Sequence, residues 1–108
     1  MRNVKIAAIQ MQCSTNLQTN LEKAEKMVRQ AAGDGAQIIL LPELFEREYF
    51  CQQRRYDFYH LAKPVEENDA VQMGMRLAKE LNVVLPISFY EQDINTLYNS
   101  IACIDADG

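Results

Sequence analysis

The residue whose type and position best suit chemistry is Glu43, which follows Pro42 at the end of an apolar segment. Ligands of open parallel α/β sheets bind outside the carboxyl ends of the strands, so a carboxylate there lies close to them. With Leu41, Leu44 and Phe45 around it, we expect this carboxylate to be partly desolvated, which suits a general base. Position alone also allows a solvated loop glutamate, so both interpretations stay open at this point.

Four other side chains are of types that act as nucleophiles, bases or metal ligands, and we favour a structural role for each. His60 has no cysteine, serine or aspartate at motif spacing. Cys13 and Cys103 lie beside or inside expected strands and are interpreted as small packing residues. Cys51 follows two aromatic residues, and because no positioned base is evident we expect packing or pocket lining. The aromatic residues at 56–59 suit a core or an interface.

The first half of the chain predicts a strand, a helix and a second strand. Residues 4–9 and 36–41 are short, apolar and partly β-branched, as in strands buried on both faces. Thr19 and Glu22 stand in capping-box spacing and predict a helix start, and Gly-Asp-Gly at 33–35 predicts its end. The apolar face of this helix is expected to comprise Leu17, Leu21, Ala24, Met27, Val28 and Ala31. Parallel strands require such a crossover.

The pattern recurs in the second half. Asn68 or Asp69 is expected to cap a helix, and strands are expected at residues 83–89 and 98–105. The apolar positions of this helix are Val71, Met75, Ala78 and Leu81. Residues 46–63 show no clean periodicity. The sequence therefore predicts an α/β fold.

The last four residues, Asp-Ala-Asp-Gly at 105–108, form an unusual end. Asp-Gly is a preferred hairpin turn, and the strand that it would start does not follow. A sheet that ended there would leave its last strand unpaired at one edge. We interpret residues 1–108 as the front part of a longer protein, with a frayed tail as the alternative.

The composition argues against several classes of protein. The chain has 108 residues, of which 48% are hydrophobic and 24% charged, as in globular domains. Its net charge of −4 leaves no basic stripe for nucleic acid, and no apolar run approaches the roughly 20 residues that span a membrane. The three cysteines are widely spaced and no secretory signal is evident, which favours a reduced, cytoplasmic protein. Without a Gly-rich phosphate loop or clustered metal ligands, we expect no cofactor.

At Leu-Pro-Glu-Leu-Phe, residues 41–45, the sequence resembles the nitrilase, or carbon–nitrogen hydrolase, superfamily. Further matching segments run in family order over nearly the whole chain: KIAAIQM at 5–11, AGDGAQIIL at 32–40 and YNSIACIDADG at 98–108. Within the superfamily, the sequence resembles the amidases that act on N-carbamoylputrescine, through residues 43–45, 49–51, 65–68 and 85–91.

The resemblance implies an αββα sandwich with a mixed sheet and flanking helices, of which residues 1–108 would be the N-terminal part of a single domain. It also implies a Glu-Lys-Cys triad that hydrolyses non-peptide C–N bonds through a thioester-type intermediate. Glu43 matches the family's general base, which makes it the catalytic candidate. The lysine and the nucleophilic cysteine have no counterpart, since Cys13, Cys51 and Cys103 do not occupy the nucleophile's motif. We therefore expect the 108-residue chain alone to be inactive.

The implied reaction converts N-carbamoylputrescine to putrescine, carbon dioxide and ammonia. Other branches act on β-ureido acids, ω-amides or nitriles, and Arg47, Arg54 and Arg55 leave a carboxylate-bearing substrate open. A non-catalytic α/β binding module is the alternative from another class. The expected partner is a small-molecule substrate, without nucleic acid or membrane, and homo-oligomers are expected by resemblance.

Overall fold

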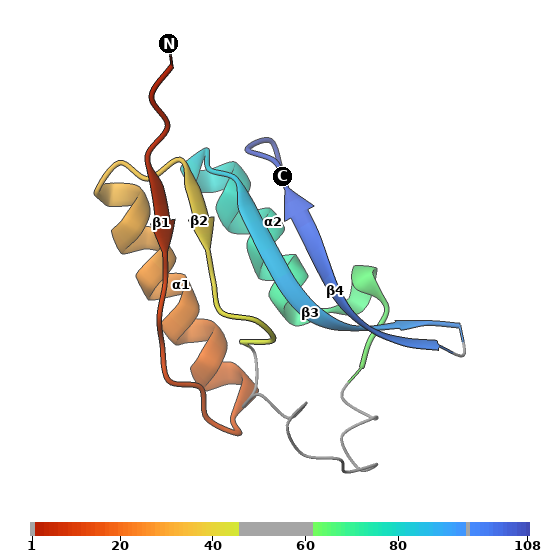
Figure 1. The fold of residues 1–108 in the computed structure, drawn as a ribbon. Coiled ribbons are helices and arrows are strands. Elements are labelled where there is room, and N and C mark those ends of the chain that lie inside the picture. Colours follow the sequence, from red (N-terminus) through yellow and green to blue (C-terminus); the bar gives the residue numbers. More distant parts are fainter. Residues whose placement is uncertain (1, 46–61, 95) are drawn as a thin grey trace.

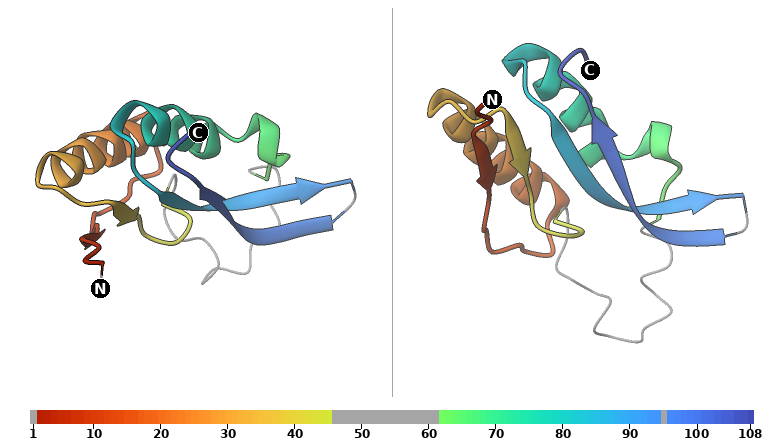
Figure 2. Two further views of the ribbon diagram at one scale, coloured as in Figure 1. Left: turned by 90° about the horizontal axis from the view of Figure 1, so that it is seen from above. Right: turned by 45° about the horizontal axis from the view of Figure 1, so that its top comes forward.

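The computed structural model describes residues 2–45, 62–94 and 96–108. In these residues a mixed β-sheet is covered on one face by two α-helices (Figures 1 and 2). The elements in chain order are β1 (Ile6–Ala8), α1 (Leu17–Gly33), β2 (Ile38–Leu40), the short 3₁₀-helix η3 (Val65–Glu67), α2 (Asp69–Leu81), β3 (Leu85–Asp93) and β4 (Thr96–Ile104).

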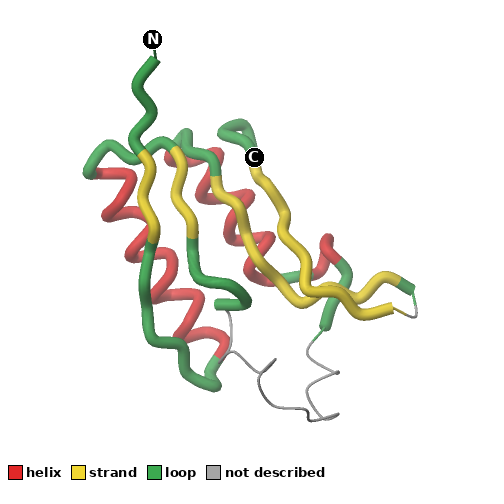
Figure 3. The backbone as a smooth tube through the Cα atoms, viewed as in Figure 1, coloured by secondary structure: helices red, strands yellow, loops and turns green. Residues whose placement is uncertain are grey.

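The sheet combines a parallel and an antiparallel pair of strands. β1 and β2 are parallel, with Ile6 opposite Ile38, as the predicted strand–helix–strand unit requires. β3 and β4 form an antiparallel hairpin in register from Leu85–Ile104 to Asp93–Thr96. The Ile39 amide donates to the Val84 carbonyl at 3.0 Å, which joins the two pairs in the order β1–β2–β3–β4 (Figure 3). The predicted α/β class with a mixed sheet is confirmed.

Helix α1 begins two residues before the predicted capping box. Asn16 is the N-cap, and its Oδ1 accepts a hydrogen bond from the Thr19 amide at 2.9 Å. The predicted cap at Thr19 is therefore wrong, because Thr19 occupies the third helical position and donates to the cap. The predicted end is confirmed: the helix ends at Gly33, and Gly35 follows with a φ of +94°, which favours glycine.

Helix α2 is capped by Asn68, which is one of the two predicted caps. The Oδ1 of Asn68 accepts a hydrogen bond from the Val71 amide at 3.0 Å. The prediction that Met75 lies on the apolar face is wrong, since 42% of it is exposed. Gly74 occupies the inner face instead. A Cβ at this position would lie 2.8 Å from both Ile87 and Ile104, so the glycine lets the helix lie close to the hairpin.

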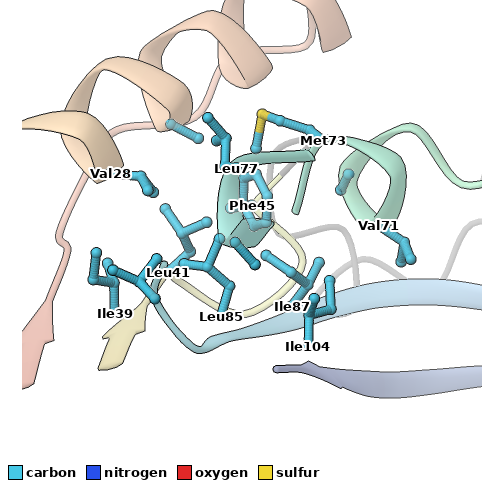
Figure 4. Close-up of a cluster of buried hydrophobic side chains, with 14 of the residues drawn as sticks. Val28, Ile39, Leu41, Phe45, Val71, Met73, Leu77, Leu85, Ile87 and Ile104 are labelled. Atoms are coloured by element: carbon cyan, nitrogen blue, oxygen red, sulfur yellow. The ribbon is translucent and has the colours of Figure 1, made fainter. Parts of the chain in front are cut away.

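The core lies between the helices and one face of the sheet (Figure 4). Fully buried side chains from every layer meet there, among them Val28, Ile39, Phe45, Leu77, Leu85 and Ile87. On the opposite face, where the described residues place no helix, Ile6, Leu40 and Ile101 are 72%, 45% and 62% exposed. One helix layer on one sheet layer corresponds to half of the expected αββα sandwich.

An ionic cluster joins the outer surfaces of α1 and α2. Glu25 accepts from Arg76 at 2.6 Å and from Arg29 at 3.1 Å, and Arg29 also pairs with Glu80. The hydrogen bond from Arg76 holds the pKa of Glu25 below its usual range; partial burial opposes this effect and Arg29 adds to it. The pKa of Glu80 is lowered as well, chiefly by Arg29.

This cluster predicts a pH-dependent contribution of Glu25 to stability. Because its folded pKa is depressed, the contribution is present above the unfolded pKa and is lost as the pH falls through the folded pKa. Glu25→Gln should lower the free energy of unfolding at pH 7 by up to about 1 kcal/mol, and the difference should shrink on acidification below about pH 4. Urea unfolding at several pH values measures it. Glu22→Gln is the control, since Glu22 contacts Gln18; equal pH dependence in both variants would contradict the assignment.

Candidate active site

Glu43 lies in a tight turn that follows β2 at its carboxyl end, as the sequence predicted. Pro42 precedes it with a restricted φ, and Leu44 follows with a left-handed φ of +50°. The side chains of Leu44 and Phe45 are 2% and 0% exposed, so both are anchored in the core. The turn is thereby fixed from the inside, and Glu43 is presented at the rim of the sheet.

A second contact holds the turn from the neighbouring hairpin. The Leu44 amide donates a hydrogen bond of 3.1 Å to the Oγ of Ser88, which is buried in the middle of β3. Such a bond satisfies a buried backbone amide whose left-handed conformation is unusual for a leucine.

The carboxylate itself contacts the other strand of the hairpin. Glu43 Oε1 accepts a hydrogen bond of 2.5 Å from Asn99 Nδ2 on β4. The expected desolvation is wrong for the described chain, because Glu43 is exposed. Leu44 and Phe45 do not wall the carboxylate, because both are buried in the core, whereas Leu41 lines the hollow beside it.

Beside this carboxylate lies an open hollow of about 370 Å³. It is bounded by residues of β2, the Glu43 turn and the hairpin: Leu40, Leu41, Glu43, Ser88, Asn99, Ser100 and Ile101. A larger hollow of about 540 Å³ lies between α1 and α2 and contains none of the predicted site residues in its lining. The smaller hollow therefore combines apolar walls with a proton-accepting carboxylate, which suits general-base chemistry.

Ser88 and Asn99 were not identified as site residues from the sequence. Both lie inside segments that resemble the family, and their types alone are common in strands. Their proximity to Glu43 depends on the hairpin register, which pairs Ser88 with Ile101 and Tyr90 with Asn99. The alternation of side chains along each strand was the one available signal, and it assigns Ser88 and Asn99 to the same face only once the hairpin register is known.

Of the cysteines and the histidine, the two that the structure describes, Cys13 and Cys103, do not line the hollow beside Glu43. Cys13 is half-buried and packs against the core, as predicted. Cys103 is exposed, so its predicted packing role is wrong: β4 places it on the sheet face that the helices do not cover. His60 and Cys51 lie outside the described residues, together with the aromatic residues at 56–59 and the arginines at 47, 54 and 55. Within residues 2–45, 62–94 and 96–108, no group of three or more His, Cys, Asp or Glu side chains is arranged to hold a metal ion.

Replacing Ser88 tests how the turn is held. In Ser88→Ala the Leu44 amide loses its buried acceptor, so we expect the free energy of unfolding to fall by about 1–3 kcal/mol. Urea unfolding with a two-state fit measures the loss. Ser100→Ala on the paired strand removes a hydroxyl that bonds to the side chain of Glu91 instead. An equal or larger loss in that variant would speak against the proposed support of the turn.

The carbon–nitrogen hydrolase family model matches residues 5–108, which is nearly the entire chain. The chain belongs to the carbon–nitrogen hydrolase family. It is 49% identical over 107 residues to the N-carbamoylputrescine amidase of Arabidopsis thaliana, and the match covers 99% of the chain and 36% of that relative. It is 46% identical over 108 residues to a citrullinase of Francisella tularensis, covering 38% of that protein. The chain thus spans little more than a third of the length of these relatives.

Solved structures of the carbon–nitrogen hydrolase family share the fold. A carbon–nitrogen hydrolase from Helicobacter pylori superimposes with a TM-score of 0.85 at 23% identity, over 96% of this chain and 36% of that one. The XC1258 protein of Xanthomonas campestris gives a TM-score of 0.83 at 16% identity, over 99% of this chain and 38% of that one. The nitrilase-type fold is therefore confirmed. Of the helices that the structure describes, none has the length and apolar character needed to cross a membrane.

Proposed function

We propose that Glu43 is the general base of an amidohydrolase and that residues 1–108 form the N-terminal part of its single domain. The observation that carries the proposal is the Glu43 carboxylate at the carboxyl end of β2, on the rim of a hollow, in a chain of this family. The family's lysine and nucleophilic cysteine would then belong to sequence beyond the chain.

The proposed chemistry requires a base for two proton transfers. A carbamoyl carbon is a poor electrophile, because both nitrogens donate electrons into the carbonyl group. Attack by a thiol forms an S–C bond while Glu43 accepts the thiol proton, and Glu43 returns this proton to the nitrogen that leaves as the C–N bond breaks. Glu43 then accepts a proton from the water that attacks the acyl intermediate, and this proton passes to the sulfur as the S–C bond breaks and the thiol is restored.

For the substrate we propose N-carbamoylputrescine, with putrescine, carbon dioxide and ammonia as products. The 48–49% identity to four plant N-carbamoylputrescine amidases supports this choice. The second candidate is citrulline, favoured by the 46% identity to the citrullinase. Both compounds carry a terminal ureido group on an aliphatic chain. They differ at the far end, where a lone ammonium favours carboxylate or aromatic groups and an added carboxylate favours an arginine.

Ammonia release by the longer protein that carries residues 1–108 tests the proposal. N-carbamoylputrescine should give a kcat/KM at least about tenfold above that of citrulline or 3-ureidopropionate, since a charged group without a partner costs on the order of 1.4 kcal/mol or more. A preference for citrulline would show that citrulline is the substrate instead of N-carbamoylputrescine, and it would leave the proposed reaction unchanged. Absence of hydrolysis of every ureido compound would contradict the proposed reaction. The 108-residue chain alone should release no ammonia, because it supplies the base without the nucleophile.

We also propose a cytoplasmic enzyme that needs no cofactor and assembles as a homo-oligomer. The proposed homo-oligomer rests on membership of the carbon–nitrogen hydrolase family.

A further inference from the structure

Among the described residues, Asn99 donates a side-chain hydrogen bond to the proposed base, and the proposed reaction assigns it no task. We propose that Asn99 is a positioning residue: its amide holds Glu43 Oε1 and thereby leaves Oε2 as the oxygen that accepts the proton. This inference rests on the proposed function and deepens it, because it names the reacting atom of the base and the group that orients it.

The chemistry of the two side chains determines which atom donates the hydrogen bond between Asn99 and Glu43. An ionised carboxylate only accepts hydrogen bonds, so the amide nitrogen of Asn99 must face it, as the 2.5 Å contact shows. Oε1 is engaged in this bond. Oε2 accepts no hydrogen bond from any residue that the structure describes, and it belongs to a carboxylate that lines the hollow. The oxygen left for a proton transfer is therefore Oε2.

The backbone around Asn99 makes it suited to this task. Asn99 lies within the paired part of a hairpin whose register runs unbroken from Leu85–Ile104 to Asp93–Thr96. The same hairpin holds the next residue of the turn through Ser88 and the Leu44 amide. The hairpin thus holds Glu43 at two points: through its carboxylate and through the backbone amide of the next residue.

A positioning residue matters here because the carboxylate of Glu43 is exposed. Glutamate has three side-chain torsions, and an exposed one usually samples many rotamers. A charge-assisted hydrogen bond to a strand residue restricts these rotamers and pre-orients the base, which lowers the cost of reaching the reactive arrangement.

Kinetics of Asn99 variants in the longer protein test the inference. Asn99→Leu keeps the size of the side chain but removes the donor, so kcat should fall by about 10–100-fold while KM stays within about threefold. Asn99→Asp places a second carboxyl group against Glu43, so the two groups should share a proton and the acidic limb of the kcat/KM profile should move to higher pH. Tyr98→Phe is the matched control, because Tyr98 is the adjacent residue of β4 and alternation places it on the opposite face.

The outcomes separate this inference from the proposed function. Asn99 is exposed, so both variants should keep the wild-type melting temperature and the kinetic changes can be assigned to the site. An unchanged kcat in Asn99→Leu, with Glu43→Gln inactive, would overturn the role of Asn99 alone. A rise in KM without a fall in kcat, or an equal loss in Tyr98→Phe, would also overturn it. Full activity of Glu43→Gln would overturn both proposals.

Discussion

Glu43→Gln is expected to lower kcat/KM for the ureido substrate by about 10²–10⁴-fold in the protein that carries this chain. Glutamine has the size and shape of glutamate but does not accept a proton at neutral pH. Its carbonyl oxygen can still accept the hydrogen bond that Asn99 donates to Glu43, so the turn should keep its geometry. The variant therefore removes proton transfer and preserves the local structure.

Steady-state ammonia release, together with the melting temperature, measures this effect. Glu91→Gln is the matched control, because Glu91 lies on β3 and its carboxylate accepts from Ser100 at 2.7 Å. It should keep activity within about threefold, as expected of a charge away from the reacting atoms. If Glu43→Gln kept more than a tenth of the activity, Glu43 would not be the base.

Phe45→Ala is expected to cost about 3–5 kcal/mol of the free energy of unfolding. Phe45 is fully buried and packs in the core between the helices and the sheet (Figure 4). Removing its ring leaves a cavity that this small core is poorly able to refill, and about 5–15 kcal/mol is the total stability of a typical domain. A large fraction of the molecules should therefore unfold near physiological temperature.

Urea unfolding with Phe45→Ala, Phe45→Leu and Met75→Ala separates burial from side-chain size. Phe45→Leu keeps part of the volume and should lose clearly less stability than the alanine variant. Met75→Ala removes a side chain that is 42% exposed on α2 and should change stability by about 0.5 kcal/mol or less. A loss below about 1 kcal/mol in Phe45→Ala would mean that the Glu43 turn is not anchored through this ring.

The elements predicted best are those specified by local sequence. The strand ahead of Glu43 and the Asn68 cap of α2 follow from short-range patterns, and the structure contains both. The cap of α1 was missed because Asn16 and Thr19 both suit a cap, and local sequence does not decide between them. The direction of Glu43 was missed for another reason: whether a residue of a tight turn faces inward depends on the backbone angles of its neighbours, here the positive φ of Leu44.

The contacts of the candidate site could not be predicted from local sequence patterns. Ser88 and Asn99 lie 44 and 56 positions along the chain from the turn residues that they contact. Their meeting with the turn requires the order β2–β3–β4 and one particular hairpin register. A single sequence gives the alternation within a strand but not which residues of two strands stand opposite each other.

The pairing of β3 with β4 determines where the protein can accept an inserted or deleted residue. Ser88 and Asn99 share a sheet face because they occupy fixed positions in nine consecutive pairs. Inserting or deleting one amino acid within either strand would shift every later position to the other side of the sheet. Such a slip would send one of these side chains towards the helices and detach it from the Glu43 turn. Insertions should therefore be accepted at the tip of the hairpin and rejected between the tip and Ser88.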